Sequence, residues 1–308
     1  MHDLVFAFAI FGATLRAAAP LGLAGLGELV SERSGVLNLG VEGMMLVGAV
    51  AGFMATAASG SPAIGLLAAM AAGAAMAAVF GFLTLSLMAN QVAAGLALTI
   101  FGTGFSALVG ARFEGVPLKG LATSIFPHLA NAPPLLQELM RLDPLVWLSL
   151  AAPFAIHWFL TRTRPGLVLR AVGESHDVAY ALGYSVIRIR YCAVLFGGAM
   201  SGLAGAYLSL AYTPMWTQDM VAGRGWIALA LVVFSTWKPL WLSLGALLFG
   251  FVTIAQFQAE ALGLQVSPQL LAMLPYLATI VVLVLISRDS VRLKLNAPGA
   301  LGKPFHAA

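Results

Sequence analysis

The stretch "GLLAAMAAGAAMAAVFG" (Gly65–Gly81) indicates how this chain folds. It is apolar from end to end and consists mainly of alanine, leucine, methionine and glycine. A membrane β-strand would instead alternate apolar and polar residues over about ten positions. Small side chains let helices approach one another closely in lipid, where packing drives their association. The stretch therefore predicts a helix that packs among other helices inside a membrane.

The composition extends this interpretation to the whole chain. Of the 308 residues, 60% are hydrophobic and 9% are charged, whereas about 25% of the residues of a soluble domain are charged. Most of the exterior must therefore face lipid, which predicts an all-α, polytopic membrane helix bundle. No segment has the composition of a soluble domain, so residues 1–308 are expected to form a single transmembrane domain.

A transmembrane helix needs about 20 mostly apolar residues, and about nine segments meet or approach this requirement. The segment 225–237 is short for a full crossing, so it is either re-entrant or tilted with an earlier start. The predicted spans lie at 4–27, 37–58, 62–87, 91–111, 144–161, 190–212, 225–237, 239–259 and 268–287.

Lysine and arginine residues predict the orientation, because cytoplasmic loops carry an excess of both. Two segments are rich in them, namely Thr161–Arg190 and the C-terminal tail from Arg288 onward. Both are expected to be cytoplasmic, because the four predicted spans between them return the chain to the same side of the membrane. Counting back places the N-terminus outside, the Ser31–Gly35 turn inside and the proline-bearing segment 112–143 outside. An additional span or a re-entrant segment would reverse the N-terminal part.

Motifs for enzymatic chemistry are absent from the sequence. There is no GxxxxGK[ST] phosphate loop and no HExxH or CxxC pair, and the serines lack a nucleophile-elbow motif. The single cysteine, Cys192, fits an ordinary small apolar position. We therefore expect neither catalysis nor a bound metal in this chain. The energy for any active transport would come from another chain or from an ion gradient.

The segment 162–190 is the largest predicted cytoplasmic segment between two spans. Glu174 and Asp177 are placed where the first turn of a helix favours acidic residues, and Gly183 is placed where a helix commonly ends. We expect a short amphipathic helix along the membrane surface. Two interpretations stay open: a loop held at the lipid headgroups by its arginines, or a docking element for a cytoplasmic partner.

Three blocks of the sequence resemble the permeases of ABC importers of the branched-chain amino acid and simple-sugar type. They are "GELVSERSGVLNLGVEGMMLVGA" (Gly27–Ala49), "RPGLVLRAVGESHDVAYALGYSVIRIR" (Arg164–Arg190) and "GRGWIALALVVFSTWKPLWLSLGALLFG" (Gly223–Gly250). Within that family, the chain resembles the shorter of two permeases that pair in nucleoside-uptake systems. It departs from the family pattern at two places. "FSTWKP" (Phe234–Pro239) replaces a glycine-containing turn, and "ESHDVAY" (Glu174–Tyr180) replaces a helix start that is richer in Asn, Pro and Ala.

The resemblance implies a cytoplasmic coupling helix that enters a cleft on a separate ATP-binding subunit. That ABC ATPase would bind ATP and Mg²⁺, so this chain would hold no cofactor. The other implied partners are a second homologous permease, an extracytoplasmic substrate-binding lipoprotein and membrane lipid, with no nucleic acid, and the implied location is the bacterial inner membrane. The residues expected to make the ATPase contact are Glu174, Ser175, Asp177, Ala179, Tyr180 and Gly183.

Two polar pairs lie within or beside the predicted spans. Asn38 and Glu42 are four residues apart, which would place them on one helix face. An ionisable group in a span costs at least about 2.5 kcal/mol at its centre and usually faces the bundle interior or a water-filled cavity. This pair either caps or bridges helix ends, for example by bonding backbone groups freed by nearby glycines, or lines the translocation path and binds substrate hydroxyls. Asn90 and Gln91 form either a cytoplasmic turn or the kinked start of a cavity-lining span.

The segment Ala211–Trp226 is expected outside the membrane, where its tryptophans fit an interfacial aromatic belt. It is either an anchored loop or part of a docking surface for a substrate-binding protein. In the second case, the contacts would come from Trp216, Gln218, Asp219 and Arg224.

The resemblance leads to a permease subunit of an ATP-driven importer that couples ATP hydrolysis on partner subunits to translocation. It implies nucleosides as the substrate, with ribose-like simple sugars as the next candidate. A stand-alone secondary transporter, in which Glu42 is the proton site, is the alternative from another class. A docking element within 162–190 would discriminate between them, because a self-sufficient carrier does not need one.

Overall fold

The computed structural model of the protein describes residues 2–118, 121, 133–261 and 296–306, together with isolated positions between 270 and 284. Within these residues the regular secondary structure is helical, apart from two isolated bridges between loops. The α-helices are α1 (His2–Arg33), α2 (Val41–Ser59), α3 (Pro62–Gly81), α4 (Gln91–Gly110), α5 (Pro134–Met140), α6 (Pro144–Arg162), α7 (Arg164–Glu174), α8 (His176–Ala181), α9 (Val186–Tyr207), α10 (Arg224–Phe234) and α11 (Pro239–Ala261). Short π-helical turns extend α3 and α9, and a 3-10 turn extends α4.

Seven helices in the described part of the chain are long and apolar enough to cross a membrane. This finding confirms the predicted polytopic helix bundle. It does not confirm the predicted number of about nine spans. Of the two remaining predicted spans, 225–237 corresponds to α10, which has 11 residues and is shorter than the roughly 20 that a helical crossing requires. The other, 268–287, falls mostly outside the described residues and stays a prediction.

Helix α9 lies at the centre of the bundle and packs against α1, α2 and α3. Glycines make these contacts possible. A Cβ atom added to Gly73 would overlap the carbonyl oxygen of Gly198, and one added to Gly202 would overlap the carbonyl oxygen of Ala69. Because α3 and α9 approach at the level of their backbones, the small-residue packing predicted from Gly65–Gly81 is the packing that the structure has.

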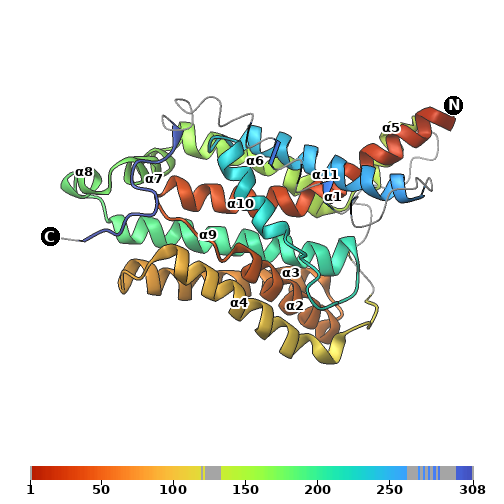
Figure 1. The fold of residues 1–308 in the computed structure, drawn as a ribbon, viewed down its shortest axis with the longest axis horizontal. Helices are drawn as coiled ribbons and strands as arrows, with labels where there is room; N and C mark the ends of the chain where they lie inside the picture. The colour runs from red at the N-terminus through yellow and green to blue at the C-terminus, as the bar shows by residue number, and fades with distance from the viewer. Residues whose placement is uncertain are drawn as a thin grey trace.

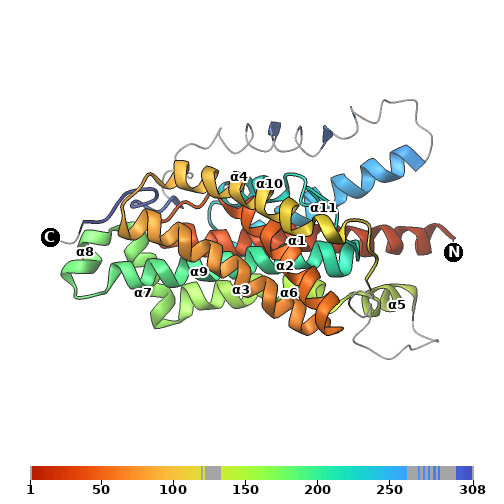
Figure 2. The same ribbon diagram turned by 90° about the horizontal axis from the view of Figure 1, so that it is seen from below.

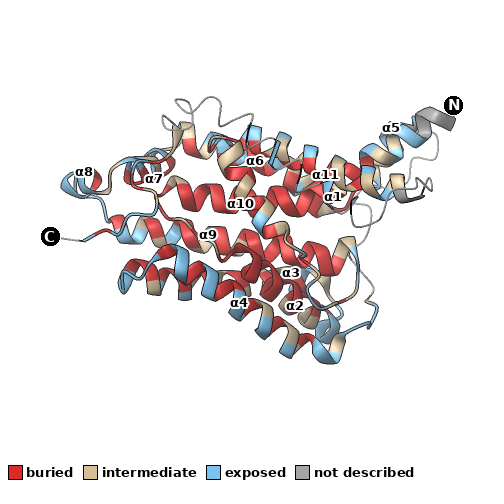
Figure 3. Cartoon of the chain, in the orientation of Figure 1, coloured by how far each residue is buried: buried red, intermediate tan, exposed pale blue. Residues whose placement is uncertain are grey.

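Many large apolar side chains are exposed on the outer helices. On α4, Ile100 is 75% exposed and Leu108 is 78% exposed, whereas the interior along α1 and α9 is buried (Figure 3). A water-facing surface would not carry such residues at this density. The outer faces of these helices therefore suit lipid.

The three segments that the charge pattern assigned to one side meet at one end of the bundle. Ala300 N donates to the carbonyl of Gly173 (2.8 Å), and Gly302 N donates to the carbonyl of Gly35 (3.1 Å). Figures 1 and 2 show α8 and the C-terminus at this end, with α5 and the N-terminus at the other. We call the end that holds α7, α8, the α1–α2 turn and residues 296–306 the basic end.

Candidate translocation and coupling sites

The chain between α1 and α2 is not helical, and it enters the bundle alongside α4. Leu37 N donates to Oε1 of Gln91 (2.8 Å), and Thr99 Oγ1 donates to the carbonyl of Leu39 (3.0 Å). Positions 91 and 99 of α4 are separated by about 12 Å along a helix axis that rises 1.5 Å per residue. Helix α2 therefore begins well inside the bundle, after a stretch of backbone whose polar groups need partners from other elements.

Asn38 lies in this non-helical stretch and does not share a helix face with Glu42, so that expectation was wrong. Helix α2 begins only at Val41. The side-chain oxygen of Asn38 accepts a hydrogen bond from Gly40 N (2.9 Å), and its backbone N–H donates to Oε1 of Glu28 (2.8 Å). Asn38 is fully buried. Its side chain stabilises the turn that leads into α2, because an Asn side chain readily bonds the backbone two residues on.

Glu42 binds the N-terminus of α10 with both carboxylate oxygens. Its Oε1 accepts from Gly223 N (2.8 Å), and its Oε2 accepts from Gly225 N (2.6 Å). The first N–H groups of a helix lack intrahelical partners, and the helix dipole favours a negative charge beside them. Glu42 therefore bridges two helix ends, as one of its two interpretations predicted, and the backbone groups that it satisfies belong to α10. Its place on a translocation path stays a prediction.

Asn90 and Gln91 lie at the basic end, at the start of α4. Asn90 caps the helix, since its side-chain oxygen accepts from Ala93 N (3.0 Å). Gln91 is 5% exposed, and its bond to Leu37 joins α4 to the entry into α2. Both residues line a cavity of about 270 Å³, whose other walls include Gly302 and Pro304 of the C-terminal segment. The structure therefore places the start of α4 beside the backbone that precedes Asn38.

The predicted coupling segment forms two helices instead of one. Glu174 ends α7, so the expectation that it lies in a first helical turn was wrong. Ser175 separates the helices and caps α8, because its Oγ accepts from Val178 N (3.4 Å). Asp177 lies in the first turn of α8. Gly183 follows the helix with a φ of +87°, a left-handed conformation that glycine adopts without strain.

Helix α8 presents an apolar surface at the far tip of the basic end. Ala179 faces inward and is 2% exposed, whereas Val178 is 60% and Leu182 is 70% exposed. Tyr180 and Tyr184 are also exposed. Figure 1 shows α8 as the outermost helix at this end. We call these four exposed residues the α8 surface.

The predicted extracytoplasmic loop lies at the opposite end and contacts the segment after α4. Gly115 N donates to the carbonyl of Trp216 (3.2 Å), and Leu118 N donates to that of Pro214 (3.0 Å). Trp216 is 1% exposed and lies against Gly110, so it supports the loop from inside. In this conformation Trp216 has almost no accessible surface with which to make its predicted contact with a binding protein.

The polar residues of the same loop differ in accessibility. Gln218 and Asp219 are exposed. Arg224 is half-buried, donates to the carbonyls of Met220 and Val221 (both 3.1 Å), and lies over the ring of Tyr212. Docking through Gln218 and Asp219 is compatible with this geometry, whereas Arg224 is already engaged in the loop.

Sequence reasoning missed a buried carboxylate pair at the basic end of α1. Glu28 and Glu32 are each 1% exposed, and Oε2 of Glu32 accepts from Nε1 of Trp237 (2.5 Å). Arg33 donates to the carbonyl of the same tryptophan (2.9 Å). The i, i+4 spacing of two carboxylates at the end of a predicted span was the available signal. These contacts hold the turn between α10 and α11 against α1.

At the end of the bundle opposite the basic end, Asp143 caps the start of α6. Oδ1 of Asp143 accepts from Leu145 N (3.0 Å) and Val146 N (3.1 Å) at the start of α6. Burial raises the pKa of the Asp143 carboxyl above its ordinary value, although the hydrogen bonds from the two N–H groups act in the opposite direction.

Comparison with known proteins agrees with this architecture. The family described as branched-chain amino acid transport system / permease component matches residues 10–286. The chain is 42% identical to a putative glucose ABC transporter permease protein of Haloferax volcanii, with 98% of each chain covered. It is 33% identical to the guanosine ABC transporter permease protein NupQ of Bacillus subtilis, with 96% of each chain covered.

A third relative is the nucleoside ABC transporter permease protein NupC of Lactococcus lactis. It is 30% identical over 86% of this chain and 88% of its own. The apolar helices, the family match and the near-complete coverage of these relatives lead to one assignment. The chain belongs to the branched-chain amino acid transport permease family, and it is a multi-pass membrane subunit of an ABC transporter.

Proposed function

We propose that this permease subunit imports nucleosides and that an ABC ATPase drives it through the α7–α8 region. The α8 surface is the observation that carries the proposal. Val178 and Leu182 are exposed, α8 is the outermost helix of the basic end (Figure 1), and a group of exposed apolar side chains there is a candidate interaction site. A partner that buries them would gain about 1.5–3 kcal/mol for each fully covered side chain.

The partner supplies the energy in this proposal, in agreement with the lack of a phosphate-binding loop in the sequence. In the proposal, ATP and Mg²⁺ bind to the ATPase, and its closure displaces α8. A second, homologous permease completes the path, and an extracytoplasmic binding protein delivers the substrate near Gln218 and Asp219. The basic end then faces the cytoplasm, in agreement with the excess of arginine in Thr161–Arg190.

The region where α2 and α10 meet is the candidate translocation element. Helix α2 begins inside the bundle and α10 is short, so two interrupted segments join at Glu42. Interrupted helices of this kind surround substrate sites in many transporters, because free backbone groups are tolerated only beside a cavity or protein. A movement of α8 that reaches the α1–α2 turn would change this junction.

The relatives support two substrate classes. Two of them are named for guanosine or nucleosides, whereas the relative with 42% identity is named for glucose. We give preference to nucleosides because the chain resembles the shorter of two permeases that pair in nucleoside-uptake systems, and we keep simple sugars as the second candidate.

The test is reconstitution in liposomes with the ATPase, the second permease and the binding protein. Uptake of radiolabelled guanosine and of radiolabelled glucose is measured with and without ATP. The proposal predicts ATP-dependent uptake that unlabelled guanosine inhibits and glucose does not. Glucose uptake alone would favour the second candidate. Flux driven by an ion gradient through this chain alone would contradict both and support a secondary transporter.

A further inference from the structure

The C-terminal segment Asn296–His306, which we call the strap, crosses the basic end and contacts several elements that are distant in sequence. Its backbone bonds α7 through Gly173 and the α1–α2 turn through Gly35. Arg33, at the end of α1, donates to the carbonyl of Asn296 (3.2 Å). The strap therefore connects the proposed coupling region to the turn that leads into α2.

An aromatic side chain anchors the strap to α8. Phe305 is 7% exposed and packs in a cluster with Val172 of α7, Ala179 of α8 and Val186 of α9. Its ring centroid lies 5.3 Å from that of His176 and 5.4 Å from that of Tyr180. Phe305 therefore fills the space between the inner face of α8 and the rest of the bundle.

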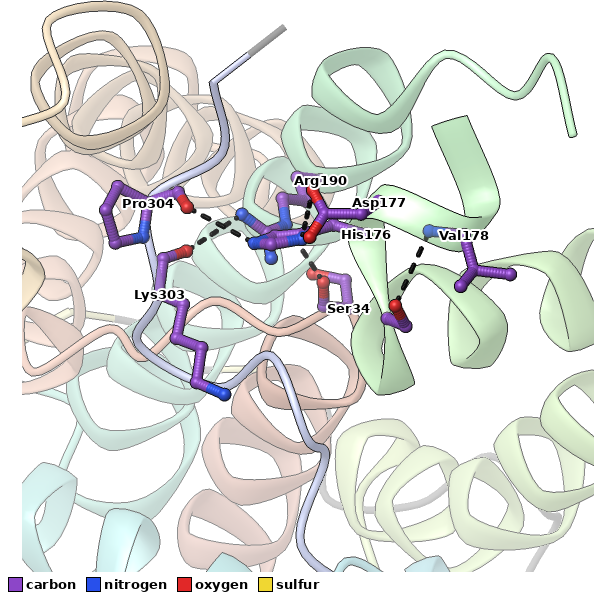
Figure 4. A network of polar contacts seen from close by, with 8 residues as sticks. Ser34, His176, Asp177, Val178, Arg190, Lys303 and Pro304 are labelled. Carbon is purple, nitrogen blue, oxygen red and sulfur yellow. Dashed lines mark hydrogen bonds and ion pairs between the residues drawn. The ribbon is translucent and has the colours of Figure 1, made fainter. Parts of the chain in front are cut away.

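A polar network reinforces this anchor, as Figure 4 shows. Arg190 is 1% exposed and bridges two segments, because its Nε donates to the carbonyl of Ser34 and its Nη1 donates to that of Lys303 (both 3.2 Å). Nε2 of His176 lies 3.2 Å from the carbonyl oxygen of Pro304. The buried guanidinium thus holds the strap and the α1–α2 turn together.

We propose that the strap is a mechanical connection that transmits movement of α8 to the α1–α2 turn, and that Phe305 is its positioning residue. The proposal rests on the proposed function of α8 as the ATPase contact. Helix α8 itself has few contacts with the bundle besides its covalent neighbours α7 and α9. The strap adds a direct route from α8 to Gly35, a few residues before the α2–α10 junction at Glu42.

The test compares Phe305→Ala with the unmodified complex in liposomes. Uptake of guanosine, or of glucose if the unmodified complex imports it instead, is measured together with ATP hydrolysis and with the amount of ATPase that co-purifies. None of the four residues of the α8 surface is substituted in the variant, so we expect the same ATPase binding. We expect the number of substrate molecules imported per ATP hydrolysed to fall about tenfold, within the usual range of coupling between two sites.

Two variants serve as controls. Lys303→Ala should leave the ratio of imported substrate to hydrolysed ATP unchanged, because the Lys303 side chain is exposed and only its backbone carbonyl bonds Arg190. Phe305→Leu keeps an apolar side chain in the cluster and should retain most of the ratio. If Phe305→Ala does not accumulate in the membrane, His176→Ala, which removes the ring contact and the Pro304 contact, is measured in the same way and should lower the ratio.

An unchanged ratio in Phe305→Ala would overturn the inference, as would a loss of import that only follows a loss of bound ATPase. If Phe305→Ala cannot be measured, either of these results in His176→Ala would overturn the inference. These outcomes are distinct from a failure of the proposed function, which would already appear as an absence of ATP-dependent uptake or of ATPase binding in the unmodified complex.

Discussion

Glu42 shows at the scale of one residue how a charge is accommodated inside the bundle. Both of its oxygens accept backbone N–H groups at the start of α10, and the side chain is 5% exposed. Glu42→Ala would leave Gly223 and Gly225 without this acceptor, at a cost of about 1–3 kcal/mol for each buried group. Glu42→Gln would keep one oxygen and turn an amide toward the other N–H group.

We therefore expect uptake at matched membrane abundance to fall more in Glu42→Ala than in Glu42→Gln, and thermal stability in detergent to follow the same order. Ser59→Ala, at the exposed end of α2, is the control and should leave both quantities unchanged. Wild-type uptake and stability in both Glu42 variants would remove the α2–α10 junction from the proposed path.

Asp143 provides a prediction about pH. Its pKa is raised in the folded state, so the folded protein binds a proton more tightly than the unfolded chain. The ionised carboxylate then costs stability above the folded pKa, and this cost disappears as the pH falls through that pKa toward the unfolded value. The melting temperature of the unmodified protein should rise relative to that of Asp143→Asn as the pH is lowered from neutral. A difference that stays constant with pH would contradict the raised pKa.

At the scale of helices, glycine determines how closely α9 packs against α3. Gly202 contacts the backbone of α3 directly, so the Cβ atom of Gly202→Ala would require the helices to separate. Overpacking of this kind costs about 1–3 kcal/mol. Gly104 on α4 is the matched control, because a Cβ atom there meets nothing within 4 Å.

We expect Gly202→Ala to lower the melting temperature of the purified protein, measured by thermal unfolding in detergent. Gly104→Ala should have no effect or raise it slightly, since alanine favours a helix by about 1 kcal/mol over glycine. Equal behaviour of the two variants would show that α3 and α9 do not approach at the level of their backbones.

For the whole molecule, the excess of lysine and arginine at the basic end predicts the orientation in the membrane. Cys192 is exposed, so labelling requires a Cys192→Ser background. Leu182→Cys on the α8 surface and Gln218→Cys in the opposite loop are each exposed. In vesicles freed of the ATPase, a membrane-impermeant maleimide should label Leu182→Cys only when the vesicles are inside-out. It should label Gln218→Cys only in intact cells. Labelling of both from the same side would contradict the proposed orientation and the ATPase contact.

The sequence by itself determined the class of the fold and the membrane environment, and it predicted the side of the basic segments. These properties depend on composition and on the local density of apolar and charged residues, which are the same in any arrangement of the helices. It also predicted a short helix ending near Gly183, because the required left-handed conformation is a local property of glycine.

Only the tertiary structure decided which backbone groups the polar residues satisfy. Glu42 bonds Gly223 and Gly225, Gln91 bonds Leu37, and Phe305 packs against α8, although long stretches of chain separate the members of each pair. A buried polar group must find a partner, but its sequence neighbours do not reveal which element supplies it. The strap and the α2–α10 junction depend on such long-range contacts, and therefore they became visible only in the folded molecule.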